Sequence, residues 1–174
     1  MEFQIEKALD HGVNVFIYDW YWFDRRPFLE QCLNDGFLKA RNNQDMKFYL
    51  MWANHDANYT WDKRNSADNT VIWQGSVDRT EFDRVCDRVI EKYFCQPNYY
   101  KIDGCPVFMI YQMDTLIEGF GGIEGTKKAL AYLREEVKKA GYPDVHIQIT
   151  ARNHFNFNVS GVDAPMKHST NELL

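Results

Sequence analysis

Apolar residues along the chain fall into two kinds of run. Continuous runs of β-branched and aromatic residues predict strands that are buried on both faces. Apolar residues at every third or fourth position predict helices between those strands. The predicted strands cover residues 13–18, 46–54, 107–112 and 145–150, with a further short strand at 162–164, and the predicted helices cover residues 2–11, 27–40, 77–94 and 127–140.

Local signals mark where several of these elements begin and end. Asp78 and Glu81 have the spacing of a capping box at the start of the helix that follows them. Pro27 stands where a helix tolerates proline, in its first turn. The Asp-Gly dipeptide at 103–104 predicts a hairpin turn before the third strand. Gly141 follows the last helical run, where glycine is a common C-terminal cap.

The alternation of strands and helices is typical of a parallel sheet with helical crossovers. Two architectures compete, the doubly wound open sheet and the (β/α)8 barrel. The dinucleotide-binding form of the open sheet needs a glycine fingerprint after its first strand, but that junction reads DWYWFDRRPF. The glycine cluster EGFGGIEGT follows the third strand and has Glu124 at the position that would complete the fingerprint. We therefore interpret this cluster as a flexible lead into the last helix.

The barrel explains the strand ends better, because (β/α)8 enzymes place their sites at the carboxyl ends of the strands. Each predicted strand has an apolar middle and a polar or aromatic end. A complete barrel takes about 250 residues, whereas this chain has 174 and starts at a helix. The sequence predicts one α/β domain, residues 1–174, that is a partial (β/α)8 TIM-like barrel without its first and last strands. An intact smaller α/β protein is the alternative.

Composition narrows the expected partners. The formal net charge of -5 argues against a nucleic-acid partner, since phosphate neutralisation needs clustered Lys and Arg. No apolar run reaches the about 20 residues of a membrane span, and no signal-peptide pattern is visible, which favours a cytoplasmic location. The open sheet edges of a partial barrel favour self-association.

The cysteines, which we expect to be reduced core thiols, are Cys32, Cys86, Cys95 and Cys105.

Aromatic content is unusually high, at 16% of the residues. Rings and polar side chains that converge at strand ends are typical of a sugar site, because pyranose C–H faces stack on flat rings while Asp, Asn and His bind hydroxyls. Glycosidic chemistry generally needs two carboxyl groups. Asp19 and Asp56 are the first candidates, and Asp24 and Asp62 are further ones. The polar loop at 54–77 is long for a compact domain, which is typical of a functional loop.

Several candidates also have a structural interpretation. Asp19 could cap a helix or form a salt bridge, the rings at 20–22 could pack under the next helix, and His55 could be a hydrogen-bonded loop residue. The histidines show no metal-ligand spacing, and no G-x-S-x-G elbow is present. The sequence thus predicts no metal, no cofactor and no serine nucleophile.

Four stretches of the chain resemble the glycoside hydrolase family 99-like proteins, a group that includes the WbsX-type glycosyltransferases of polysaccharide biosynthesis. They are FIYDWYWFDRRPFLEQCL, KFYLMWANHDANYTWD, YFCQPNYYKIDGCPVFMIY and GGIEGTKKALAYLREEVKKAGYPDVHIQ. The resemblance implies a (β/α)8 barrel that hydrolyses or transfers glycosidic bonds of a glycan. It also implies sugar-site roles for Asp19, Tyr21, Trp22, Trp52 and Asn54.

Two departures from that family change the expected chemistry. WbsX-like sequences commonly read Trp-Ala-Asn-Glu-Asn where this chain has His55 and Asp56 after Asn54, so a carboxylate role there shifts to Asp56. The late Trp-Asn-Glu-Trp-type strand end is missing, which keeps a non-catalytic or vestigial glycan-binding fragment as the alternative. The predicted site comprises Asp19 and Asp56 as catalytic acids and Tyr21, Trp22, Trp52, Asn54, His55 and Tyr111 as sugar-binding residues.

Overall fold

The computed structural model describes residues 1–59, 64, 67 and 69–150. The predicted strand at 162–164 and the candidate acid Asp62 lie outside the described residues. The described elements are α1 (Glu2–Asp10), β1 (Val15–Phe23), β2 (Arg26–Phe28), η1 (Cys32–Phe37), η2 (Asn43–Asp45), β3 (Lys47–Trp52), β4 (Ala57–Asn58), β5 (Val71–Trp73), α2 (Arg79–Val89), η5 (Ile90–Phe94), β6 (Lys101–Ile102), β7 (Cys105–Ile110), α3 (Met113–Gly119), α4 (Ile123–Lys139) and β8 (His146–Ile149).

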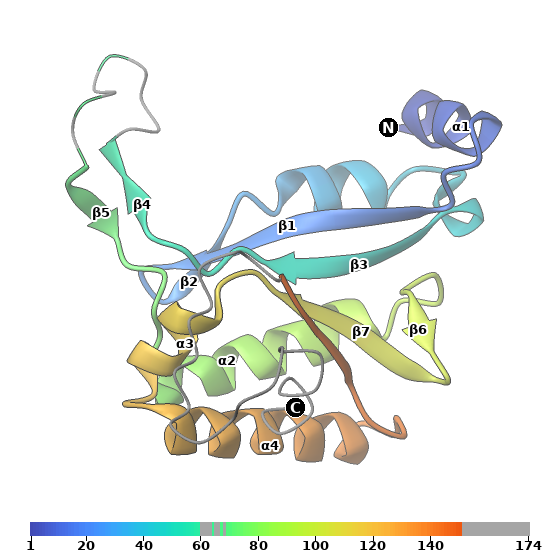
Figure 1. Cartoon of the computed structure of the whole chain (residues 1–174). Coiled ribbons are helices and arrows are strands. Elements are labelled where there is room, and N and C mark those ends of the chain that lie inside the picture. Colours follow the sequence, from blue (N-terminus) through green and yellow to red (C-terminus); the bar gives the residue numbers. More distant parts are fainter. Residues whose placement is uncertain (60–63, 65–66, 68, 151–174) are drawn as a thin grey trace, which may run out of the picture.

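The centre of the fold is a parallel sheet in which β1, β3, β7 and β8 lie side by side in chain order (Figure 1). The short strand β2 pairs antiparallel with the end of β1, and β6 pairs antiparallel with the start of β7. The fold is mixed α/β, and its sheet is curled like half a barrel. Sequential parallel pairing is also how a (β/α)8 barrel is built. The partial barrel itself stays a prediction.

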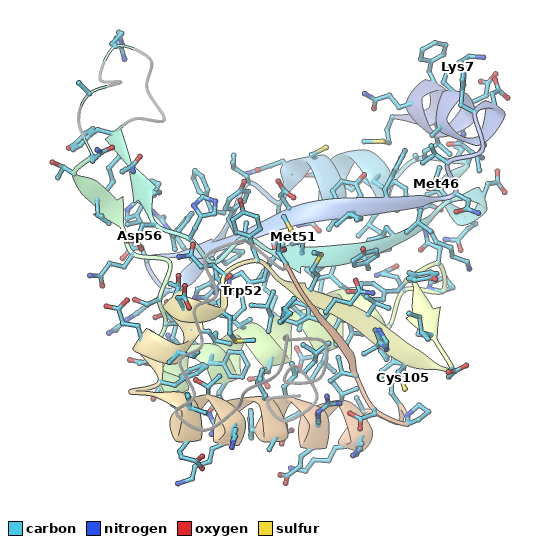
Figure 2. All side chains as sticks on the ribbon, viewed as in Figure 1. Lys7, Met46, Met51, Trp52, Asp56 and Cys105 are labelled. Carbon is cyan, nitrogen blue, oxygen red and sulfur yellow. The ribbon has the colours of Figure 1, made fainter. Side chains whose placement is uncertain are left out.

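One face of the sheet is covered by helices and holds the core. The Trp52 ring of β3 stacks on Phe82 of α2, with ring centroids 5.9 Å apart, and on Phe108 of β7 at 6.4 Å. Phe37 of η1 packs on Phe48 of β3 at 5.2 Å. All five rings are buried. Figure 2 shows Trp52 between the strands and α2.

The opposite face, which we call the inner face, carries the alternate residues of the same strands, since neighbouring strand residues point to opposite sides. Strand register brings four of them into one row across the sheet. Asp19 lies opposite Met51, Met51 opposite Met109, and Met109 opposite Gln148. Tyr21 lies two residues after Asp19 on the same face. Residues from all four parallel strands therefore share one surface.

The greatest difference from the sequence-based expectation lies after β1. This strand runs on to Phe23, and a two-residue turn with positive φ at Asp24 (51°) and Arg25 (60°) joins it to β2. Such turns usually have glycine after asparagine or aspartate, and the arginine at position 25 left this turn without that sequence signal. Pro27 lies in β2 opposite Trp22, which corrects its prediction in a helical first turn. An edge strand tolerates proline because one side of it needs no N–H donor.

The helical segment that was predicted from residue 27 is much shorter in the structure. It begins near Cys32 as the π-helical turn η1, in which Leu38 N donates to Leu33 O over 2.9 Å. Cys32 is exposed, as is Cys95, so neither is the core thiol that the sequence predicted, whereas Cys86 is buried. The helix α3 was not predicted at all.

The predicted helices at 2–11, 77–94 and 127–140 and the predicted strands at 46–54, 107–112 and 145–150 are confirmed with shifted ends, although the second helix ends as the π-helical turn η5. The short strands β4 and β5, which lie in the segment predicted as a polar loop, were not predicted. Half of the capping box is confirmed, since Asp78 Oδ1 accepts a 2.8 Å hydrogen bond from Glu81 N, while the Glu81 carboxylate accepts from Trp22 Nε1 and Arg25 N. Asp103 and Gly104, with φ of 51° and 80°, form the predicted turn between β6 and β7. Gly141, with φ of 95°, donates its N–H to Lys138 O and ends α4 as expected.

Candidate functional site

Three aromatic side chains from successive strand ends meet on one side of the sheet. The His55 ring, just after β3, lies 6.0 Å from the Tyr21 ring of β1, with an interplanar angle of 87°. On its other side it lies 5.5 Å from the ring of Tyr111, which follows β7. All three side chains are partly exposed. The structure therefore brings together three of the predicted sugar-binding residues, and we call them the ring trio.

Asp19 lies beside this trio on the inner face and is exposed. Within residues 1–59, 64, 67 and 69–150, its carboxylate makes no hydrogen bond and no salt bridge. The pKa of Tyr21 is raised, first by burial and second by the negative charge of Asp19. The side chains of Asp19 and Tyr21 are thus close enough to interact electrostatically. Tyr21 stays a neutral hydrogen-bonding ring at neutral pH.

Asn54, which was predicted to bind sugar, is used inside the fold. Its Nδ2 donates to Gln112 O over 2.6 Å, and its Oδ1 accepts from Gln112 N over 2.8 Å. The residue is 1% exposed. The amide therefore connects the end of β3 to the end of β7, and it sets the spacing between His55 and Tyr111.

Asp56 lies at the base of the β4–β5 hairpin, as labelled in Figure 2, and is exposed. Its Oδ1 accepts a 2.8 Å hydrogen bond from Gly75 N, and its backbone oxygen lies 2.9 Å from His55 Nδ1. A Cβ added to Gly75 would lie 2.4 Å from the carbonyl carbon of His55. Only glycine allows this approach, which holds the His55 peptide in place. Sequence reasoning missed Gly75, although it is a lone glycine in the loop that was predicted to be functional.

Trp22 and Trp52 point to the helical face rather than to the inner face. Trp22 is 5% exposed, and its Nε1 donates to Glu81 Oε1 over 2.8 Å. Glu81 Oε1 also accepts from Arg25 N over 3.0 Å, so it ties the β1–β2 turn to α2. Trp52 is fully buried. Both tryptophans pack on the helical side of the strand ends, and the contact of Trp22 is to α2 rather than to the next helical segment, η1.

A buried carboxylate that the sequence did not single out lies on that same helical face. The side chain of Glu30 is 9% exposed and accepts hydrogen bonds from Trp20 Nε1 (2.8 Å), Tyr93 OH (2.7 Å) and Arg88 Nε (2.8 Å). Burial raises the pKa of Glu30, but the bonds from Arg88, Trp20 and Tyr93 outweigh it and lower the pKa to about 2. Glu30 thus stays ionised and joins the segment before η1 to β1, α2 and η5.

The part of the chain that the structure describes also bears on metal binding, membrane spans and surface depressions. There, no three His, Cys, Asp or Glu side chains gather as metal ligands would. No described helix combines the length and the apolar character that crossing a bilayer requires. A shallow depression between α1 and η1, lined by Met1, Phe3 and Lys39 among others, shares no residue with the ring trio.

Comparison with known proteins adds one match. The model of the family described as "Glycosyltransferase WbsX" matches residues 1–173. No curated protein and no solved structure matches the chain. The family match covers almost the whole sequence, including every residue of the candidate site.

Proposed function

We propose, from the premise that this chain belongs to the WbsX glycosyltransferase family, that the strand ends of its inner face bind a glycan and act on a glycosidic bond. Membership makes the chain a carbohydrate-active protein. The observation that carries the proposal is the ring trio, because three separate strands deliver Tyr21, His55 and Tyr111 to one side of the sheet beside Asp19. Partly exposed rings next to a carboxylate suit the apolar faces and the hydroxyls of a sugar.

The side chains of this site take different roles in the proposal. Tyr21 and Tyr111 offer ring faces and hydroxyls to the sugar, and His55 between them binds a hydroxyl or moves a proton. Asp19 binds a sugar hydroxyl or acts as one of the two acids. Asp56 is the other predicted acid, and its carboxylate also accepts a hydrogen bond from Gly75 N. The remaining predicted residues, Trp22, Trp52 and Asn54, act as positioning residues, since they are buried and contact the helices or Gln112.

Hydrolysis and transfer place the same groups around the bond, so both reactions fit the site. Each generally needs two carboxyl groups. A second candidate function, glycan binding without catalysis, is favoured by one specific observation. Asp56 accepts a hydrogen bond from Gly75 N, whereas Asp19 makes no hydrogen bond in the described chain. Only one of the two predicted acids therefore has a carboxylate without a hydrogen bond, while catalysis generally needs two carboxyl groups.

A direct test combines binding with product analysis. The protein is run in affinity gels that contain a panel of bacterial polysaccharides and yeast mannan, and the same mixtures are analysed by chromatography for released or lengthened chains. We expect retardation by at least one polysaccharide, and weaker retardation for Tyr21→Ala. The matched control is Tyr132→Ala, because Tyr132 lies on α4 under Arg79, on the helical side.

The outcomes separate the candidates. Retardation together with product supports the enzyme, and retardation without product supports the binding protein. The proposed glycan-binding site would be wrong if no polysaccharide retards the wild-type protein, or if the Tyr21→Ala variant binds like the wild type.

A further inference from the structure

Ring contacts continue from the ring trio to the far end of the β1–β2 hairpin. The Tyr21 ring stacks with Phe23 at 6.0 Å, and Phe23 stacks with Trp73 of β5 at 5.9 Å and an interplanar angle of 24°. Phe28 of β2 meets the same indole edge-on at 5.3 Å. Together with His55 and Tyr111, these side chains form one unbroken series of rings, which we call the ring strip. It joins β7, β3 and β1 to the β4–β5 hairpin, which projects beyond the sheet in Figure 1.

Several exposed apolar residues lie next to the outer end of the ring strip in the sequence or across the β4–β5 hairpin. Trp73 and Phe28 are themselves partly exposed. Soluble proteins rarely expose several large apolar residues together unless the surface binds something. The exposed neighbours, with 42–56% of their surface accessible, are Leu29, Tyr59, Val71 and Ile72.

Charged groups border this apolar surface at the β1–β2 turn. Asp24 and Arg26 are exposed and form a loose ion pair, with 3.8 Å between Arg26 Nη2 and Asp24 Oδ2. Arg25 beside them is exposed as well. A surface of flat rings edged by hydrogen-bonding groups matches a sugar, which has apolar ring faces and a polar rim. A purely apolar partner helix would leave those charged groups without water or partners.

We propose, as an extension that rests on the proposed function, that the ring strip binds further sugar residues of the same glycan, with Trp73 as an outer subsite. The ligand is then an oligosaccharide or a polysaccharide whose chain runs from the ring trio along β1–β2 to β5, rather than a single sugar. Continuity carries this inference, because each ring of the strip contacts the next one and the inner end is the candidate site itself. Phe23, which is 3% exposed, is the buried link between the two subsites and does not itself bind sugar.

The test uses the polysaccharide that the wild-type protein binds best, together with a disaccharide and a long fragment prepared from it by partial hydrolysis. Binding is measured by titration calorimetry for the wild type, Trp73→Leu and Tyr21→Ala. Leucine keeps apolar volume against Phe23 and Phe28 but removes the flat ring. We expect Trp73→Leu to weaken binding of the long fragment by about threefold to tenfold and to leave binding of the disaccharide unchanged.

Tyr21→Ala is expected to weaken binding of both ligands, because it alters the inner site. Thermal melting of each variant shows whether the fold is kept, and Trp73→Phe, which restores a ring, should recover long-fragment binding. If Trp73→Leu binds the long fragment like the wild type, or loses both ligands equally while Trp73→Phe does not recover, the outer subsite is wrong and the inner site stands. If the wild type binds no polysaccharide, both proposals fail.

Discussion

Asn54 and Gln112 exchange a closed pair of hydrogen bonds, in which the Asn54 amide donates to Gln112 O over 2.6 Å and accepts from Gln112 N over 2.8 Å. Sequence separation between them is 58 residues. The pair holds together the ends of β3 and β7, and therefore the positions of His55 and Tyr111. An amide that looks like a sugar ligand in the sequence is instead a positioning group in our proposal.

Asp19→Asn should weaken glycan binding or activity about tenfold to a hundredfold, since a charged hydrogen-bond acceptor is worth about 1.5–3 kcal/mol. The free energy of unfolding should change by less than about 0.5 kcal/mol, because Asp19 is exposed and makes no bond in the described chain. Calorimetric titration and chemical denaturation measure the two quantities. Asp45→Asn, at an exposed position in η2, is the matched control. If the Asp19→Asn protein is unfolded, Asp19 has a structural role. If its binding and activity are unchanged, Asp19 has no role in the site.

Gly75→Ala should displace the His55 peptide, since the new Cβ would meet the carbonyl carbon of His55 at 2.4 Å and its oxygen at 2.6 Å. We expect about 1–3 kcal/mol of lost stability together with weaker glycan binding, as measured by denaturation and titration. Gly36→Ala is the control, because a Cβ there would lie an ordinary 3.5 Å from Met1 Cε. Equal behaviour of the two variants would show that the contact at Gly75 does not position the site.

Trp52→Ala should cost about 3–5 kcal/mol of unfolding free energy, because it leaves a cavity between Phe82 and Phe108. Glycan affinity of the folded fraction should fall as well, since Trp52 supports the end of β3 beneath Asn54. The control is Phe94→Ala, which removes another fully buried ring, from η5. If both variants bind glycan with the same affinity, Trp52 has no specific link to the site.

Glu30→Gln should destabilise the protein by about 1.5–3 kcal/mol at neutral pH, because it removes the charge that accepts hydrogen bonds from Arg88 and Tyr93. Chemical denaturation measures the loss. Glu91→Gln serves as the control, since Glu91 is exposed on η5. A loss no larger than that of the control would contradict the proposed role of Glu30 in joining these elements.

Glu30→Gln should also change how the free energy of unfolding depends on pH. The pKa of Glu30 is about 2 in the folded chain, below its ordinary value of about 4.3. A lowered folded-state pKa stabilises the fold above the ordinary value, and that stabilisation is lost as pH falls from about 4.3 towards about 2. The stability difference between wild type and Glu30→Gln should therefore shrink across this window. A difference that stays constant from pH 5 to about 2 would contradict the lowered pKa.

Much of the architecture follows from local patterns in the sequence. Continuous apolar runs predict β3, β7 and β8 within a few residues, and helical spacing predicts α2 and α4. These patterns are readable because a buried strand or helix face imposes its own period on the chain. The turn at Asp24 and Arg25 escaped prediction because Asp24, which tolerates positive φ, is followed by arginine rather than by the glycine that marks such turns.

The candidate site is predictable only in part. Polar and aromatic residues at strand ends pointed to Tyr21, His55 and Tyr111, which do meet in space. The same pattern pointed to Trp22 and Trp52, which face the helices. Composition at a strand end cannot tell the two faces apart, because alternation gives each face every second residue.

By itself, the sequence determined the kind of fold, the order of its elements and the chemistry gathered at the strand ends, since these depend on residue type and spacing along the chain. Tertiary structure decided which side chains of β1 and β3 reach the inner face, that Asn54 bonds to Gln112, and that Gly75 lies against His55. The physical reason is that strand register and close backbone approach join residues far apart in the chain, and no local pattern records which distant partner each will meet.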